Sequence, residues 1–207
     1  MLSSGGFDLW ADGYDKSVDL CDKEDKYPFA GYKDVLNKIY RNVHKREYAR
    51  VLDIGFGTGT LTKKLYDDGY QIYGIDFSQK MIDISKKKMP YAVLMRYDFA
   101  YGLPEEVSNI QFDFIISSYA FHHLTDIAKV ELIKQSLNCL TGDGMVLIGD
   151  VSFETRVKLD TCRKESGNQW DNDEIYMVFD EMKDYFPEGK IMYKEISYCA
   201  GITMFVK

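Results

Sequence analysis

Short apolar runs alternate with amphipathic segments from residue 50 onward. The apolar runs are rich in β-forming residues and predict strands over 50–54, 71–76, 91–98, 112–119 and 145–150. Between them, apolar positions at helical spacing predict helices over 60–69, 78–90 and 125–140. Ser78 is suited to cap the second helix and Pro90 to end it, and Thr125 or Asp126 to cap the third. The third helix carries Ile127, Val130, Leu137 and Leu140 at helical spacing.

Strict alternation of strands and helices is typical of βαβ units. It predicts an α/β fold with a parallel, doubly wound sheet and helices on both faces. Ligands of such sheets bind beyond the carboxyl ends of the strands, near the switch point. The stretch TGDG, residues 141–144, predicts a turn, and the pattern after residue 150 predicts a helix over 174–187 and two β segments over 189–207. Residues 1–48 indicate irregular structure or added helices, and the chain, residues 1–207, is expected to form one domain.

The segment VLDIGFGTGT, residues 51–60, places Asp53 near the end of the first strand and Gly55, Gly57 and Gly59 behind it. A strand that runs straight into a helix needs a sharp turn, and glycine permits the positive φ that such turns often require. The missing Cβ also lets a ligand approach the backbone at the helix N-terminus. The dinucleotide fingerprint GxGxxG is not met, because Thr60 stands at its third glycine position, and this disfavours a nicotinamide-linked oxidoreductase.

With this D-x-G-x-G-x-G pattern the chain resembles the class I S-adenosylmethionine-dependent methyltransferases. The resemblance implies S-adenosylmethionine as the cofactor. It also implies a mostly parallel, seven-stranded Rossmann-like sheet with an antiparallel last strand, which YCAGITMFVK at residues 198–207 fits. The positions that the resemblance places at the cofactor are Asp53, Gly55, Gly57, Gly59, Asp76, Phe77, Asp98, Phe99 and Ser117.

Two of the expected cofactor contacts have alternatives. Asp76 ends the second predicted strand, 21 residues after Gly55, and its carboxylate can accept hydrogen bonds from both hydroxyls of a ribose. A strand-end aspartate can also serve only as a helix cap. Met81 lies on the following helix and fits an adenine contact and a plain core position equally well. In the family, an acidic residue at the position of Asp98 meets the adenine amino group, and its neighbour lines the ring pocket.

Two further stretches carry the resemblance. SSYAFHHL, residues 117–124, is similar to many small-molecule methyltransferases and lacks the Asn-Pro-Pro-aromatic signature of amino-methylating nucleic-acid enzymes. FDLWADGYDKSV, residues 7–18, resembles the opening of a group of small bacterial methyltransferases, which implies that Trp10 and Tyr14 help to close the site. Ordinary packing of an N-terminal helix is the alternative for this pair. Residues 1–48 are thus expected to form a lid and acceptor segment. His122 is the candidate general base because histidine suits proton removal near neutral pH; a structural role is the alternative for it and for His123.

Charge and cysteine content narrow the expected partners. The 207 residues carry a formal net charge of -7, so nucleic acid is not an expected partner. The four cysteines are far apart, predict neither disulfides nor a metal site, and favour a reducing compartment, so we expect a cytoplasmic protein. We expect no signal peptide and no membrane partner, because no apolar run approaches the ~18 residues of a span.

The sequence therefore predicts an enzyme that methylates a small-molecule acceptor. Three alternatives stay open at this point: a binding protein for S-adenosylmethionine or S-adenosylhomocysteine without catalysis, a methyltransferase of RNA or protein, and an oxidoreductase.

Overall fold

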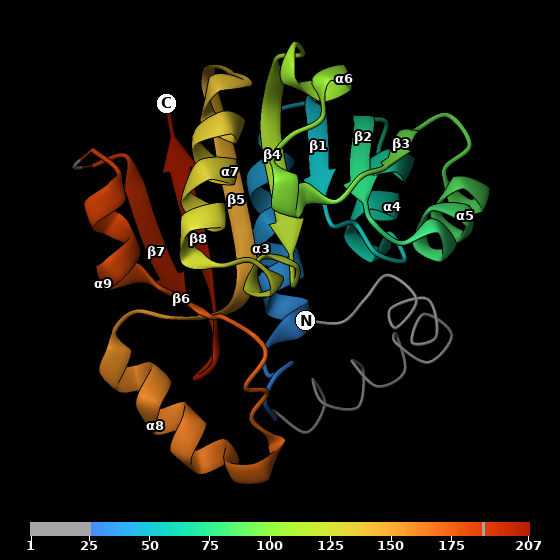
Figure 1. The fold of residues 1–207 in the computed structure, drawn as a ribbon. Helices are drawn as coiled ribbons and strands as arrows, with labels where there is room; N and C mark the ends of the chain where they lie inside the picture. Colours follow the sequence, from blue (N-terminus) through green and yellow to red (C-terminus); the bar gives the residue numbers. More distant parts are fainter. Residues whose placement is uncertain (1–25, 188) are drawn as a thin grey trace.

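A mixed β-sheet runs through the centre of the computed structural model, which describes residues 26–187 and 189–207 (Figure 1). Seven strands follow the order β3-β2-β1-β4-β5-β8-β7, and the short β6 pairs with the end of β5. The first five strands are parallel, and β8 is antiparallel to both of its neighbours. The strands are β1 Arg50–Ile54, β2 Gln71–Asp76, β3 Val93–Arg96, β4 Phe112–Ser118, β5 Leu140–Phe153, β6 Met177–Val178, β7 Ile191–Glu195 and β8 Ala200–Val206. The predicted doubly wound sheet with an antiparallel last strand is confirmed, with β6 as an additional strand.

Helices cover both faces of this sheet (Figure 1). Val51 and Leu52, neighbours on β1, belong to two different core clusters, because successive strand residues point to opposite faces. One cluster includes side chains from α3 Tyr32–Val43, α4 Thr60–Asp67 and α5 Gln79–Lys88. The other includes side chains from α6 Glu105–Ser108, α7 Asp126–Asn138 and α9 Phe179–Met182. None of the helices within the described ranges has the length and apolar content needed to cross a bilayer.

Local signals located most helix ends correctly. The Ser78 side chain accepts a hydrogen bond from the Met81 N–H at 3.2 Å and caps α5. Thr125 caps α7 in the same way by accepting from the Ala128 N–H at 3.3 Å. The expected apolar face of α7 is wrong in part: Ile127 is 76% exposed, and Leu140 opens β5. The helix instead buries Lys129, Val130, Leu132, Ile133 and Ser136.

The region after β5 differs from the sequence-based prediction. A helix over 174–187 is wrong, because Met177 and Val178 pair with Ser152 and Phe153 of β5, which leaves only the short α9 and a 3-10 turn, Lys183–Tyr185. A helix that the pattern did not reveal, α8 Arg156–Ser166, precedes it and lies below the strand ends in Figure 1. The expected turn at 141–144 is not a separate turn but lies within β5. It corresponds to a shift in the pairing with β4, because Leu140 pairs with Phe112 whereas Met145 pairs with Phe114.

A buried carboxylate joins β1 to α4 beside the glycine segment. Asp53 is 1% exposed, and its Oδ2 accepts a hydrogen bond from the Thr62 hydroxyl at 2.6 Å. Its Oδ1 has no hydrogen-bond partner. Burial raises the pKa of Asp53 to about 7, the Thr62 hydrogen bond lowers it, and the charge of Asp76 raises it further. The folded chain therefore favours the protonated form of Asp53.

Replacing Asp53 with asparagine tests this proton. Because the folded pKa lies above the ordinary value of 3.8, the stability that the group contributes is full below about pH 4 and is lost as the pH rises through about 7. Relative to Asp53→Asn, the wild type should lose up to roughly 4 kcal/mol of unfolding free energy across that window. Urea unfolding at a series of pH values measures the difference. A difference that stays constant from pH 4 to pH 8 would contradict the buried proton.

Candidate functional site

The three glycines after β1 serve two different purposes. Each has a positive φ, of 72° at Gly55, 55° at Gly57 and 77° at Gly59, so the turn needs residues without a Cβ penalty. A Cβ on Gly55 would lie 2.5 Å from the Ala120 Cβ, and a Cβ on Gly59 would lie 3.0 Å from the Ser85 hydroxyl. A Cβ on Gly57 would meet nothing within 4 Å. Close packing thus explains the first and third glycines, whereas Gly57 presents open backbone to a ligand.

Asp76, at the carboxyl end of β2, fixes the shape of this loop. Its Oδ2 accepts a hydrogen bond from the Gly57 N–H at 2.9 Å, and its Oδ1 accepts one from the Ser78 N–H at 2.9 Å. The side chain is 4% exposed and lines a cavity. These two backbone contacts orient the carboxylate, whose oxygens can each accept more than one hydrogen bond.

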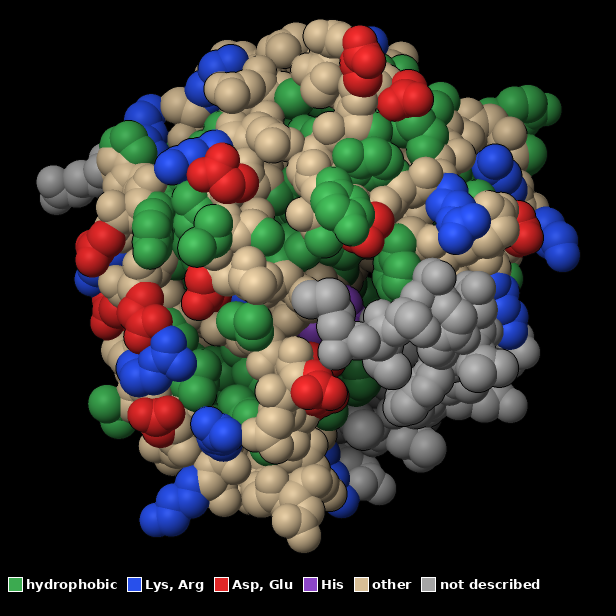
Figure 2. All heavy atoms as spheres, viewed as in Figure 1, with side chains coloured by type: hydrophobic (Ala, Val, Ile, Leu, Met, Phe, Trp, Pro, Cys, Tyr) green, Lys and Arg blue, Asp and Glu red, His purple; other side chains and the backbone are tan. Residues whose placement is uncertain are grey.

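A cavity of about 400 Å³ opens beyond the carboxyl ends of β1, β2 and β4. In the space-filling view, histidine atoms show at the bottom of a hollow, and acidic and basic side chains are interspersed around it (Figure 2). The lining is acidic and aromatic: it includes three carboxylates and, among the residues that the structure describes, neither lysine nor arginine. The carboxylates are Asp76, Asp171 and Glu174, and the aromatic side chains include Tyr27, Phe29, Tyr32 and Tyr119.

The structure brings many of the predicted site residues together at this cavity, and others do not line it. Those that line it are Gly55, Gly57, Asp76, Phe77, Met81, Phe99 and His122. Asp53, Gly59, Asp98 and Ser117 are not among the lining residues. Trp10 and Tyr14 lie outside the described residues.

Backbone hydrogen bonds account for two of the residues that do not line the cavity. Asp98 is exposed, and its Oδ1 accepts from the Ala100 N–H at 3.0 Å, which caps a 3-10 turn at Phe99–Tyr101. The Ser117 hydroxyl donates to the Ile54 carbonyl at 2.7 Å and links β4 to β1. The first contact is local to the turn after β3, and the second joins the ends of β4 and β1.

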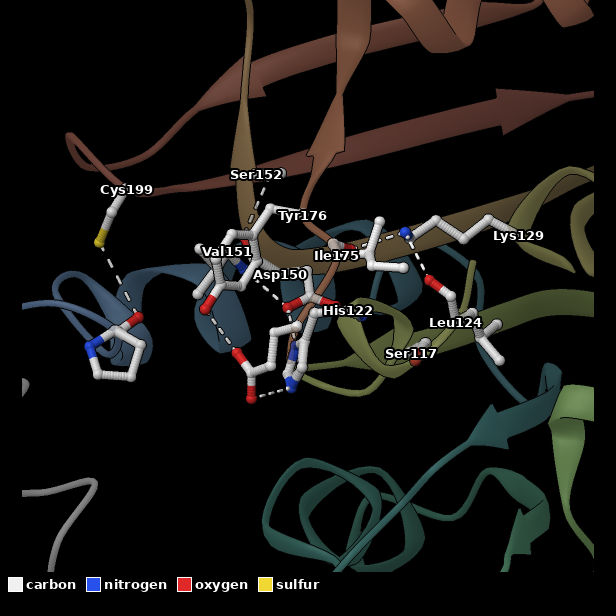
Figure 3. A network of polar contacts seen from close by, with 12 residues as sticks. Ser117, His122, Leu124, Lys129, Asp150, Val151, Ser152, Ile175, Tyr176 and Cys199 are labelled. Atoms are coloured by element: carbon white, nitrogen blue, oxygen red, sulfur yellow. Dashed lines mark hydrogen bonds and ion pairs between the residues drawn. The ribbon is translucent and has the colours of Figure 1, made fainter. Parts of the chain in front are cut away.

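His122 lies between two carboxylates on the β5 side of the cavity (Figure 3). Its Nδ1 lies 2.6 Å from Asp150 Oδ1, and its Nε2 lies 3.4 Å from Glu174 Oε1. The His122 main-chain N–H donates to Asp150 Oδ2 at 3.1 Å. Burial acts to lower the pKa of His122, but the two carboxylates outweigh it, so this pKa is raised. The neighbouring His123 has the opposite shift, because burial and the charge of His122 lower its pKa to about 3.

Side-chain hydrogen bonds hold the segment that carries Glu174 and Tyr176 close to His122. The Tyr176 hydroxyl donates to Glu174 Oε2 at 2.6 Å, and the hydroxyls of Tyr27 and Tyr176 form a short hydrogen bond. Burial raises the pKa of Glu174. Residues 27 and 176 thus connect the N-terminal part of the described chain to the wall of the cavity.

Sequence reasoning missed Asp150, Glu174 and Tyr27. Asp150 follows the apolar run MVLIG, the same signal that singled out Asp53 and Asp76, so it could have been found. Glu174 was assigned to a helix that does not form, and nothing near it in the sequence indicates that it meets His122. Tyr27 lines the cavity because of the tertiary fold, and no local sequence pattern indicates this position.

Comparisons with known proteins assign the chain to a family. A methyltransferase domain family matches residues 51–144. The chain is 39% identical over 163 residues to an uncharacterized methyltransferase of Oceanobacillus iheyensis, a match that covers 77% of this chain and 73% of the relative. A second uncharacterized methyltransferase, from Alkaliphilus oremlandii, is 32% identical over 182 residues, 88% of this chain and 81% of that protein.

A solved structure shares the fold. Magnesium protoporphyrin IX methyltransferase from Synechocystis, with bound S-adenosylhomocysteine, superposes with a TM-score of 0.68 at 16% identity, over 86% of this chain and 84% of that one. The matching fold, the glycine loop at the end of β1 and the identity to curated relatives agree with one another. The chain therefore belongs to the methyltransferase family and is an S-adenosylmethionine-dependent methyltransferase.

Proposed function

We propose that the protein transfers the methyl group of S-adenosylmethionine to a small-molecule acceptor inside the cavity described above. The observation that carries this proposal is one continuous cavity, lined on one side by Gly57 and Asp76 and on the other by His122 and Glu174. Its volume of about 400 Å³ lies in the range of small-molecule sites. An acidic, aromatic lining suits a cofactor that carries a sulfonium and an ammonium group.

The cofactor is proposed to lie along the carboxyl ends of β1 and β2. Asp76, already oriented by two backbone N–H groups, would accept hydrogen bonds from the ribose hydroxyls. Phe77, Met81 and Phe99 supply apolar surface for the adenine ring. The open backbone at Gly57 lets the ligand come close to the start of α4. A contact of Asp98 with the adenine amino group stays a prediction.

For methyl transfer, the protein mainly has to align the acceptor with the methyl group of the cofactor. In the transfer, the bond between the methyl carbon and the sulfonium sulfur breaks, sulfur keeps the electron pair as a neutral thioether, and the acceptor forms the new bond to carbon. The acceptor, methyl group and sulfur must lie in line, and water must be kept out. The aromatic side chains that line the cavity support the second requirement.

The proposed role of His122 as a general base depends on its protonation. Its ring lines the cavity, but both nitrogens contact carboxylates, and its pKa is raised. The ring therefore keeps its proton to a higher pH than an ordinary imidazole, and it can take a proton from the acceptor only above that pH.

An acceptor smaller than a macromolecule is favoured over RNA or protein. The formal net charge of -7 and the acidic lining of the cavity oppose a phosphate backbone. Tyr27, Phe29 and Tyr32 line the cavity and support the idea that residues 1–48 form an acceptor segment. The buried thiols of Cys139 and Cys162, which form no disulfide within the described residues, support a reducing, cytoplasmic location.

Asp76→Asn tests the placement of the cofactor. The change keeps the shape of the side chain and removes the charge, so a charge-assisted hydrogen bond worth roughly 1.5–3 kcal/mol is weakened. The affinity for S-adenosylhomocysteine, measured by calorimetry, should fall at least about tenfold.

The matched control is Asp67→Asn, an exposed aspartate of α4 that pairs with Lys63, and it should leave the affinity unchanged. NAD should give no heat of binding with either protein. Equal affinities of Asp76→Asn and wild type would reduce Asp76 to a structural support of the loop.

Transfer of a radioactive methyl group to the fractions of a cell extract tests whether the acceptor is a small molecule. Purified protein is incubated with labelled S-adenosylmethionine and a cell extract that has been separated into small molecules, RNA and protein. We expect label to accumulate in the small-molecule fraction, in an amount that depends on active enzyme. Label found only in macromolecules would contradict the small-molecule proposal, and no transfer to any fraction would favour a binding protein without catalysis.

A further inference from the structure

Two imidazoles and one carboxylate meet on the β5 side of the cavity. One ligand atom from each of His122, His123 and Glu174 lies within 4.8 Å of the other two. All three residues line the cavity, so the space between their donor atoms is reached from the place proposed for the acceptor. The sequence predicted no metal site here, because Glu174 is distant from the histidine pair along the chain.

The spacing of two of these donors suits a tetrahedral metal ion. His122 Nε2 and Glu174 Oε1 are 3.4 Å apart. With metal–ligand bonds of about 2.0–2.1 Å, two vertices of a tetrahedron are about 3.3–3.4 Å apart. Two histidines and one glutamate with a fourth position left open form one of the donor sets of zinc sites that bind water or substrate.

Hydrogen-bond partners of His122 and Glu174 orient these two donors, as the outer partners of metal ligands do in metal sites. Asp150 Oδ1 lies 2.6 Å from His122 Nδ1, so Nε2 is the nitrogen left to face Glu174. A carboxylate on the far nitrogen is the usual support of a metal-binding histidine. The Tyr176 hydroxyl holds Glu174 Oε2 at 2.6 Å, which leaves Oε1 for the ion. Figure 3 shows His122, Asp150 and Tyr176 gathered around this point.

Main-chain contacts hold the two segments that carry the donors together. The fully buried ammonium group of Lys129 donates to the Leu124 carbonyl at 2.8 Å and to the Ile175 carbonyl at 2.7 Å. The Ile175 N–H donates to the His122 carbonyl at 2.9 Å. These contacts fix the main chain on both sides of the donors, so an ion would need mainly side-chain adjustment to draw the three donors together.

We propose that His122, His123 and Glu174 bind a divalent first-row transition-metal ion, with an open coordination position toward the cavity. Imidazole donors favour Zn²⁺, Co²⁺ or Ni²⁺, whereas Mg²⁺ and Ca²⁺ favour oxygen donors. The part of this inference that concerns methyl transfer rests on the proposed function. In methyl transfer, the ion would act as a Lewis acid on an acceptor group bound at the open position. It would favour loss of that group's proton to solvent as the acceptor binds, in place of His122 as a base.

Cobalt is the probe for this site, because four-coordinate Co²⁺ absorbs visible light. Untagged full-length protein is treated with chelator, dialysed and titrated with CoCl₂. We expect one equivalent to bind at micromolar concentration with the spectrum of four-coordinate cobalt. Glu174→Gln and His123→Asn should each weaken binding by more than about 100-fold, and Asp150→Asn, which removes only the support of His122, by about 10–100-fold.

His44→Asn is the matched control, because His44 is an exposed histidine beyond the cavity, and it should bind cobalt as the wild type does. Circular dichroism confirms that each variant is folded. Wild-type protein that binds no stoichiometric cobalt, or folded Glu174→Gln and His123→Asn proteins that bind it at full strength, would overturn the metal site. Binding of S-adenosylhomocysteine is measured separately, so its loss would count against the proposed function and leave the metal result standing.

Discussion

The contact of His122 with two carboxylates is the interaction on which the cavity depends. Asp150 belongs to the central strand β5, whereas Glu174 belongs to a late segment that has little regular structure of its own. By contacting both, the imidazole joins the turn after β4 to the sheet and to the late segment that forms the same wall of the cavity. Lys129 strengthens the same junction from behind, because a buried ammonium group needs the carbonyls of both segments. The wall that carries His122 and Glu174 is therefore held together by buried charged groups and their hydrogen-bond partners.

The other wall is formed by backbone. Gly55 has no room for a side chain because Ala120 occupies that space, and Ala120 follows Tyr119, whose own φ is 51°. The turn after β1 and the turn after β4 thus fit against each other, and the open backbone of Gly57 is left facing the cavity. Asp76 ties this arrangement to β2 through the Gly57 N–H. The donor side and the acceptor side share the turn at residues 119–123, which would couple cofactor position to the groups that meet the acceptor.

Sequence reasoning succeeded where the controlling interactions are local. The alternation of strands and helices, the caps at Ser78 and Thr125 and the positive φ of the three glycines all depend on residues a few positions apart. It failed where a distant partner decides the conformation. Residues 174–178 have a helical pattern, yet Ile175 bonds to His122 and Met177 pairs with Ser152, so the backbone stays extended. The cofactor contacts expected of Asp98 and Ser117 stay predictions, and in the structure these side chains bond to the Ala100 N–H and the Ile54 carbonyl.

A crystal structure of the protein with S-adenosylhomocysteine tests the central claim, that one cavity aligns a methyl donor with an acceptor. We predict that the ribose contacts Asp76, that the adenine lies near Phe99, and that the thioether sulfur points toward His122 and Glu174. A ligand bound outside this cavity, or one whose sulfur points away from His122 and Glu174, would contradict the account.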